Sequence, residues 1–277
     1  MTDAADRHLP FAVLHVPHAS RVVPDQDRAS ILLTDEALSA ELLRMTDSFT
    51  DELFRLDTRV ARSIVFRVSR LVVDPERFLD DSVEPMSSRG MGVVYTRTAD
   101  GEALRGAVDE KTRQALVTAY YLPHHCRLSE AVEAAAGRWG SCLVIDCHSF
   151  PSSPLPYEFD QSPERPEICL GIDAFHTPAP LAAVAVGLFR DAGFQVQLDR
   201  PFSGALVPRA HYQRDARVMA IMAEVNRSLY MDEVSGERLA TFGEIASRLR
   251  SAVTRLIEAA RDVAGRRLPS VSPHWGD

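Results

Sequence analysis

Short apolar segments that alternate with longer amphipathic stretches constrain the fold of this chain more than any other feature. The first is FAVLHV at residues 11–16, and CLVID at 142–146 is another. Runs of this length that are apolar at nearly every position are typical of strands buried on both faces of a sheet. Because such strands alternate here with helical patterns, we predict an α/β sheet covered by helices on both faces.

The same pattern gives the expected elements. Proline ends the first strand at Pro17 and divides a long helical region into two helices at Pro123. We expect strands near 11–16, 63–68, 142–146, 167–172, 194–198 and 219–225, and helices near 34–56, 104–136, 180–192 and 243–264. Residues 74–101 are rich in Pro, Ser, Gly and Asp, and long loops of this kind are often functional. We predict a single domain over residues 1–277, with its core at about 10–264.

Charge and composition exclude several functional classes. The formal net charge is -8 over 277 residues, which argues against a nucleic-acid partner. No apolar run is long enough to cross a bilayer and the N-terminus has no secretory pattern, so we expect a cytoplasmic protein without a membrane partner. The cysteines form no CxxC pair, and we expect them to be reduced and mostly buried.

Two histidines in the sequence HVPHAS stand at the end of the first predicted strand. Side chains alternate along a strand, and Pro17 favours a turn after His15, so His18 is expected at the carboxyl end of the strand. Ligands of open α/β sheets gather at that edge. Metal binding and structural hydrogen bonding both remain open for this pair, because a metal motif depends on its geometric context.

A further histidine follows the strand CLVID, in the sequence DCHS. His148 is therefore also expected at a strand end, with Asp146 on the same strand face. Two histidines from neighbouring strands can share a metal ion, and a metal-bound imidazole usually has a carboxylate or carbonyl partner. The alternative is a buried histidine bonded to Asp146, and the presence of two such elements favours the metal interpretation.

A hydrolytic zinc site needs a third protein ligand and an open position for water. The candidate carboxylates are Asp47, Asp74 and Glu224. Asp47 lies in a predicted amphipathic helix, where exposure to solvent is the alternative. Glu224 interrupts the apolar run MAIMAEVN, and burial would raise its pKa and suit it to proton transfer. An ion pair with Arg227 or Arg217 is the alternative for Glu224.

Several arginines are candidates for binding an acidic substrate. Arg70, Arg77 and Arg89 lie in or beside the long loop, and Arg209 follows the segment PFSGALVP. A guanidinium group binds a carboxylate through two parallel hydrogen bonds. The alternative for each of these arginines, taken alone, is a surface charge without a role in binding, which is the more common case.

Six segments of the chain, taken in order, resemble those of the N-formylglutamate amidohydrolase family. They are HVPHAS, TDSFTDELF, SRLVVDPER, VIDCHS, PFSG and EVNRSLYMDE, and they extend from about residue 11 to residue 233. The resemblance implies a zinc-carboxypeptidase-like (phosphorylase/hydrolase-like) fold with three layers and a mixed central sheet. It also implies hydrolysis of N-formyl-L-glutamate to formate and glutamate, a step of histidine degradation.

The same resemblance implies roles for particular residues in catalysis. One zinc ion per chain would be held by His18, Asp47 and His148, and Glu224 would act as general base and acid. The hypothesis that follows is attack of an activated water on the amide carbon, with transfer of its proton to nitrogen by Glu224.

The resemblance implies an arginine clamp for the substrate as well. Arg77 would hold the substrate carboxylate, Arg70 would help to stabilise the oxyanion, and Arg89 and Arg209 are further candidate contacts. Glu76 departs from the pattern, since the family commonly has an asparagine before the clamp arginine. An added negative charge there would weaken binding of a dicarboxylate.

Three other functions remain open. The chain could hydrolyse another N-acyl amino acid or a short peptide at the same metal site, or be an inactive binding homologue. A cysteine amidase would use Cys147 beside His148, although adjacent strand residues face opposite ways. The sequence gives no role for His15 or His211, and it fits either a monomer or a homodimer.

Overall fold

A computed structural model describes residues 9–267 of the chain. Residues 1–8, which are part of the segment without a secretory pattern, lie outside the described residues. The strands are β1 (Ala12–Val16), β2 (Ala61–Val65), β3 (Cys142–Phe150), β4 (Ile168–Gly171), β5 (Val196–Leu198) and β6 (Val218–Asn226). The helices are α1 (Asp25–Arg28), α2 (Asp35–Met45), α3 (Thr50–Leu53), α4 (Glu110–Leu116), α5 (Leu122–Trp139), α6 (Ala179–Asp191) and α7 (Phe242–Arg267). Short 3-10 helices cover Pro85–Arg89 and Arg227–Leu229, and a π-helical turn covers Val117–Tyr121.

The strands form a six-stranded mixed sheet in the order β2-β1-β3-β6-β4-β5. Strands β2, β1, β3 and β6 run parallel, whereas β4 is antiparallel to β6 and parallel to β5. The carboxyl ends of β1, β3 and β6 therefore meet at one edge. The predicted α/β class and the mixed central sheet are confirmed.

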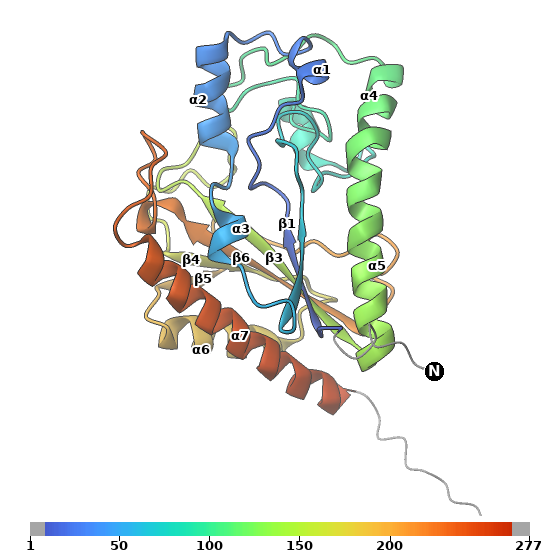
Figure 1. The fold of residues 1–277 in the computed structure, drawn as a ribbon, viewed down its shortest axis with the longest axis vertical. Coiled ribbons are helices and arrows are strands. Elements are labelled where there is room, and N and C mark those ends of the chain that lie inside the picture. The colour runs from blue at the N-terminus through green and yellow to red at the C-terminus, as the bar shows by residue number, and fades with distance from the viewer. Residues whose placement is uncertain (1–8, 268–277) are drawn as a thin grey trace, which may run out of the picture.

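Helices cover both faces of this sheet, which gives three layers. Figure 1 shows α6 and α7 together on one side and α5 on the other. The alternating side chains of β3 explain the arrangement, because successive residues point to opposite faces. Leu143, Ile145 and Cys147 pack with the core on the α6 and α7 side, and Cys142 and Val144 pack on the α5 side.

One of the expected helices is interrupted at a place that matters for the site. We predicted a single helix near 34–56, but α2 ends at Met45 and α3 begins only at Thr50. The chain leaves helical geometry at Thr46, and Phe49 has a φ of 68°, in the left-handed region. Asp47 therefore lies in a turn and not on a helix face, and this corrects the prediction.

Hydrogen bonds to other parts of the chain hold this turn. The backbone N–H of Asp47 donates to the carbonyl of His18 at 2.9 Å. The hydroxyl of Thr50 donates to the carbonyl of Asp47 at 2.8 Å. The periodic leucines of the sequence predict a continuous helix, but here the helix is interrupted by a turn that one local bond and one tertiary bond, to His18, hold in place.

Strand β3 also differs from the prediction. It was expected to end at Asp146, but it stays paired with β6 as far as Phe150, opposite Asn226. His148 consequently lies within the strand and not after it. Asp146 and His148 still share one strand face, as predicted, because they are two residues apart.

The remaining connections agree with the sequence only in part. The predicted break at Pro123 is wrong, because α4, the π-helical turn and α5 form one uninterrupted helical run from Glu110 to Trp139, with Pro123 just after the π-helical turn. Apart from the short 3-10 helix, residues 74–101 form an ordered loop that folds over the end of the sheet. Within residues 9–267, every helix is too short or too polar to cross a membrane.

Candidate active site

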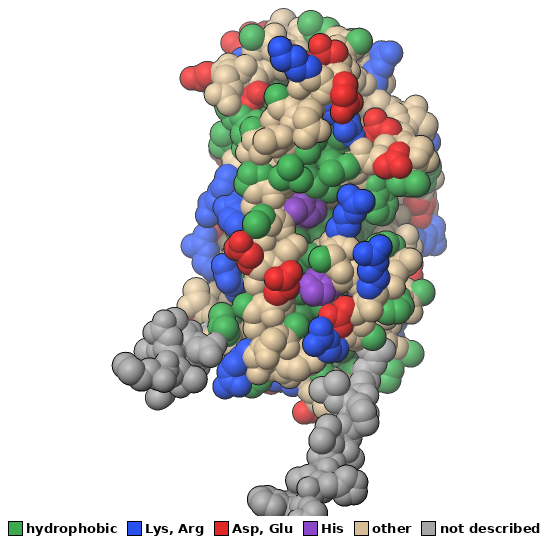
Figure 2. Space-filling view, turned by 90° about the vertical axis from the view of Figure 1, so that its right-hand side faces the viewer, with side chains coloured by type: hydrophobic (Ala, Val, Ile, Leu, Met, Phe, Trp, Pro, Cys, Tyr) green, Lys and Arg blue, Asp and Glu red, His purple; other side chains and the backbone are tan. Residues whose placement is uncertain are grey.

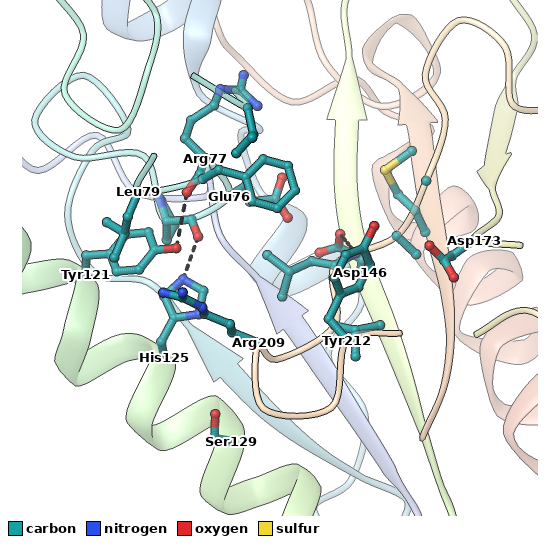
Figure 3. A pocket seen from close by; sticks show the side chains of 18 of the residues that line it. Glu76, Arg77, Leu79, Tyr121, His125, Ser129, Asp146, Asp173, Arg209 and Tyr212 are labelled. Carbon is teal, nitrogen blue, oxygen red and sulfur yellow. Dashed lines mark hydrogen bonds between the residues drawn. The ribbon is translucent and has the colours of Figure 1, made fainter. Parts of the chain in front are cut away.

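A cavity of about 1030 Å³ opens beside β3 and β6, at Asp146 and Met222. Its walls come from the loop after Asp74, from α5, and from residues 203–214, and they include Glu76, Arg77, Tyr121, His125, Asp146, Asp173, Arg209 and Tyr212 (Figure 3). On the face that contains α5, histidine side chains reach the surface among basic and hydrophobic side chains (Figure 2). The cavity therefore combines both charge signs with apolar wall surface.

His18 follows β1, is almost completely buried, and lies near Glu76, which lines the cavity. Its Nε2 lies 2.8 Å from Oδ1 of Asp74. Its Nδ1 has no hydrogen-bond partner and faces Oδ2 of Asp47 at 3.6 Å. Since a metal-bound imidazole commonly has one nitrogen on a carboxylate, this arrangement leaves Nδ1 as a free donor for a metal.

Asp47 lies between two imidazole groups. Its Oδ2 is 3.0 Å from Nδ1 of His148 as well as near His18, and its Oδ1 accepts a hydrogen bond from Arg227 at 3.0 Å. Burial alone would raise the pKa of Asp47, but hydrogen bonds to His148 and His18 hold it well below its ordinary value. The carboxylate is therefore charged, buried and oriented toward both histidines, and the expected alternative of exposure to solvent is wrong.

His148 contacts carboxylates through both ring nitrogens. Its Nε2 lies 3.1 Å from Oε1 of Glu76 and 3.1 Å from Oδ1 of Asp146, on the side of the ring away from Asp47. Its Nδ1 is thus the atom directed to the same space as Nδ1 of His18. The structure brings together the three residues that were predicted as metal ligands.

Two overlapping groups of side chains in this region have the spacing needed to hold a metal ion. One consists of His18, Glu76 and His148, and the other of His15, Glu76 and Asp146. Glu76 belongs to both. Asp47 lies on the opposite side of His148 from Glu76, so a metal ion bound by the two histidines could take either carboxylate as a further ligand. Nδ1 of His18 has no other partner. Two imidazoles and a carboxylate fit a hydrolytic zinc ion.

Glu224 lies on β6 directly opposite His148 in the sheet register. Its side chain is buried, and its Oε2 has no hydrogen-bond partner. Burial raises the pKa of Glu224 to about 8, with negative charge on Asp47 and Glu76 adding to the effect. The alternative, an ion pair of Glu224 with Arg227 or Arg217, is not found among the described residues, where Arg227 pairs with Asp47 and Arg217 with Asp215.

The predicted arginines occupy different surroundings. Arg77 and Arg209 line the cavity. Arg70 is buried and donates from one terminal nitrogen to Asp74 at 2.9 Å and from Nε to Tyr95 at 3.2 Å. Arg89 lies apart from the cavity wall, is exposed, and stacks on the ring of Phe159 at 4.9 Å.

Some site residues could not be identified from the sequence. Glu76 was noticed only as a departure from a motif, and its place between the histidines depends on how the long loop folds. His15 binds Asp146 through Nδ1 and His124 through Nε2, both at 2.8 Å. The sequence gives no signal for the pair of His15 and His124, since they are 109 residues apart.

Two other candidate groups lie outside this arrangement. His211 is 3.3 Å from Asp215 and is not part of the cavity wall. Cys147 points to the opposite face of the sheet from His148, into the core, and burial raises the pKa of its thiol. A thiol in that place is unsuited to nucleophilic attack.

Comparisons with known proteins identify relatives of this chain. A family model described as N-formylglutamate amidohydrolase matches residues 11–231. The crystal structure of an N-formylglutamate amidohydrolase from Ralstonia eutropha JMP134 is similar, with a TM-score of 0.76 and 22% identity over 94% of this chain and 98% of that chain. A gene product of Agrobacterium tumefaciens has a TM-score of 0.61 and 20% identity, covering 93% of both chains. No curated protein sequence matches the chain.

Proposed function

The chain belongs to the N-formylglutamate amidohydrolase family, and from this premise we propose that it hydrolyses the N-formyl amide of N-formyl-L-glutamate or of a similar N-acyl amino acid. One observation carries the proposal for this chain. Glu224, a buried carboxyl with an unpartnered oxygen, lies beside His148 in a cluster that also contains His18 and Asp47. A proton-transfer group next to side chains that can hold a metal ion is suited to metal-assisted amide hydrolysis.

We propose one zinc ion in this cluster, held by His18, Asp47 and His148. The support is that Nδ1 of His18 is buried without a partner, while its Nε2 is oriented by Asp74. When bound there, the ion supplies Lewis-acid activation of a water molecule and of the scissile carbonyl group.

The side chains of the protein do the rest of the proposed chemistry. Glu224 takes a proton from the attacking water and gives it to the amide nitrogen as the C–N bond breaks, which releases formate and the free amino acid. Arg70 uses Nε and one terminal nitrogen for Tyr95 and Asp74, which leaves its second terminal nitrogen for the developing oxyanion.

The cavity provides the binding site for the amino-acid part of the substrate. Arg77 and Arg209 lie in its wall and would bind carboxylate oxygens. Glu76 lies beside Arg77 in the same wall, and a negative charge there disfavours a second carboxylate nearby. This observation favours the second candidate, an N-acyl amino acid whose side chain is not acidic.

With N-formyl-L-glutamate as substrate, the reaction would belong to histidine degradation in the cytoplasm, carried out by a single domain.

A substrate panel with metal analysis tests the proposal. Purified protein is incubated with the formyl and acetyl derivatives of glutamate, glutamine and leucine, before and after chelation, while the released acid and the metal content are measured. We expect zinc and chelator-sensitive release of formate, with the preferred side chain distinguishing the two candidates. Protein without zinc and without amide hydrolysis would overturn the proposal.

A further inference from the structure

A second group of potential metal ligands lies next to the proposed zinc site and is not used by it. His15 Nδ1 is 2.8 Å from Oδ1 of Asp146 and 3.6 Å from Oε1 of Glu76. The three donor atoms converge on one point, as they do in a metal site with one imidazole and two carboxylates. His15 is completely buried, and Asp146 is 2% exposed.

In the described part of the chain, the two carboxylates of this group have no arginine or lysine partner. Among the described residues, Asp47 has an ion pair with Arg227 and Asp74 has one with Arg70. Within residues 9–267, Glu76 and Asp146 form ion pairs only with histidines. Burying a carboxylate without a partner of opposite charge is strongly unfavourable. A cation between these two carboxylates would remove that penalty.

While His148 binds the proposed zinc ion, it cannot carry the positive charge that would balance Glu76 and Asp146. An imidazole that binds a metal through Nδ1 is neutral and keeps a single hydrogen on Nε2. Nε2 of His148 lies 3.1 Å from both Glu76 and Asp146, so the two carboxylates share one N–H. This step rests on the proposed function, because it takes zinc as bound to His148.

The group is also held in place by its surroundings. Nε2 of His15 lies 2.8 Å from Nε2 of His124, which orients the ring so that Nδ1 faces the carboxylates. Oδ2 of Asp146 accepts a hydrogen bond from the backbone N–H of Leu206 at 3.0 Å, and this leaves Oδ1 for the cluster. Such supporting contacts are typical of metal ligands.

Glu76 connects the two groups. Its Oε1 lies near His15 and His148, while its Oε2 lies 3.9 Å from Nδ1 of His18. The two oxygens of one carboxylate thus face different clusters. Glu76 and Asp146 also line the cavity, so an ion can enter from solvent (Figure 3).

We propose that His15, Glu76 and Asp146 bind a second divalent cation beside the zinc site, with Glu76 shared between the two. One imidazole and two carboxylates suit Zn²⁺ or Mn²⁺. In this arrangement the second ion neutralises the two carboxylates that lack a basic partner, and it makes Glu76 a ligand instead of a repulsive charge in the cavity.

Metal stoichiometry tests this proposal separately from activity. Metal-depleted protein is dialysed against Zn²⁺ alone, or against Mn²⁺ alone, and the bound ion is measured by elemental analysis. We expect two ions per chain in the wild type and one in Glu76→Gln and in His15→Gln. Glu133→Gln removes an exposed carboxylate from α5 and serves as the matched control, with two ions expected. Circular dichroism establishes that each variant is folded, and Glu76→Gln, which is nearly isosteric, serves if His15→Gln does not fold.

The variant His18→Gln separates the two sites. Suppose that the wild type binds only one ion per chain. If His18→Gln loses this ion while Glu76→Gln and His15→Gln keep it, the second site is overturned and the zinc site is supported. If His18→Gln keeps the ion and His15→Gln loses it, the second site is supported and the zinc site is contradicted. Protein that binds no ion from either solution would overturn both.

Discussion

At the scale of single residues, Glu224 combines burial with a missing partner. Its pKa is raised to about 8, so the carboxyl both accepts and releases a proton near neutral pH. We predict that Glu224→Gln lowers kcat by about 10²- to 10⁴-fold with little change in KM, because the amide keeps the shape but cannot transfer a proton. The measurement is steady-state hydrolysis of the preferred substrate, with the exposed Glu258→Gln on α7 as the control. An unchanged kcat would remove Glu224 from the mechanism.

A second prediction at the residue scale concerns His124 and the pH dependence of folding stability. It is completely buried, and burial together with the charge of His15 lowers its pKa to about 2. Between pH 6.5 and 2 the unfolded chain therefore binds a proton at this residue and the folded chain does not, so folding stability is lost as the pH falls below 6.5. The loss should be about 2 kcal/mol at pH 5.

Urea unfolding at pH 7 and pH 5 measures this effect. His124→Gln has no proton to bind, so its stability should fall less than that of the wild type between the two pH values. Both proteins are compared after metal depletion, so that metal release does not contribute. Equal losses in the two proteins would show that His124 is not the group responsible.

At the scale of elements, the turn between α2 and α3 decides where Asp47 lies. The periodic leucines predict helical structure over both segments, although as one continuous helix, and Thr34 caps α2 by accepting a hydrogen bond from Ala37 N–H. The sequence could not indicate the break, because the bond that holds the turn is made to the carbonyl of His18. Local periodicity carries no information about such a partner, and Asp47, a proposed metal ligand, was therefore placed on a helix and not in a turn.

Arg227 connects this turn to the rest of the site. It donates to Oδ1 of Asp47, to the carbonyl of Arg44 at the end of α2, and to the hydroxyl of Ser149 on β3. We predict that Arg227→Met lowers zinc affinity by about 10- to 100-fold, because Asp47 loses its orienting partner. Competition with a zinc chelator measures the affinity. Arg217→Met, which removes an exposed arginine paired with Asp215, should leave the affinity unchanged; equal losses in the two variants would contradict the positioning role.

At the scale of the whole molecule, a sequence pattern predicts the position of a single strand or motif but not which distant segments pack together. The strands that carry His15 and Glu224 were predicted close to their observed positions, whereas the strand before His148 extends beyond its predicted end, and parallel pairing brings the three strands side by side. The place of Glu76 could not be predicted, since it depends on the path of a loop without periodicity. Buried pairs such as His15 with His124 depend on helix α5 packing against β1, which no local pattern specifies.

If metal binds as proposed, the stability of the whole chain depends on it. The proposed ligands come from β1 and the residues after it, from the α2–α3 turn, from the long loop and from β3, so an ion there would connect segments that separate on unfolding. An ion that binds only the folded chain, at 100 times its dissociation constant, stabilises it by about 3 kcal/mol. For a chain of this size we predict that chelation lowers Tm by about 5 to 10 °C. Differential scanning calorimetry with and without chelator measures the change, and added Zn²⁺ should restore the Tm of the wild type fully and that of His18→Gln only in part, since that variant keeps the proposed second site. A Tm that does not respond to chelation would mean that these segments are held together by their own packing alone.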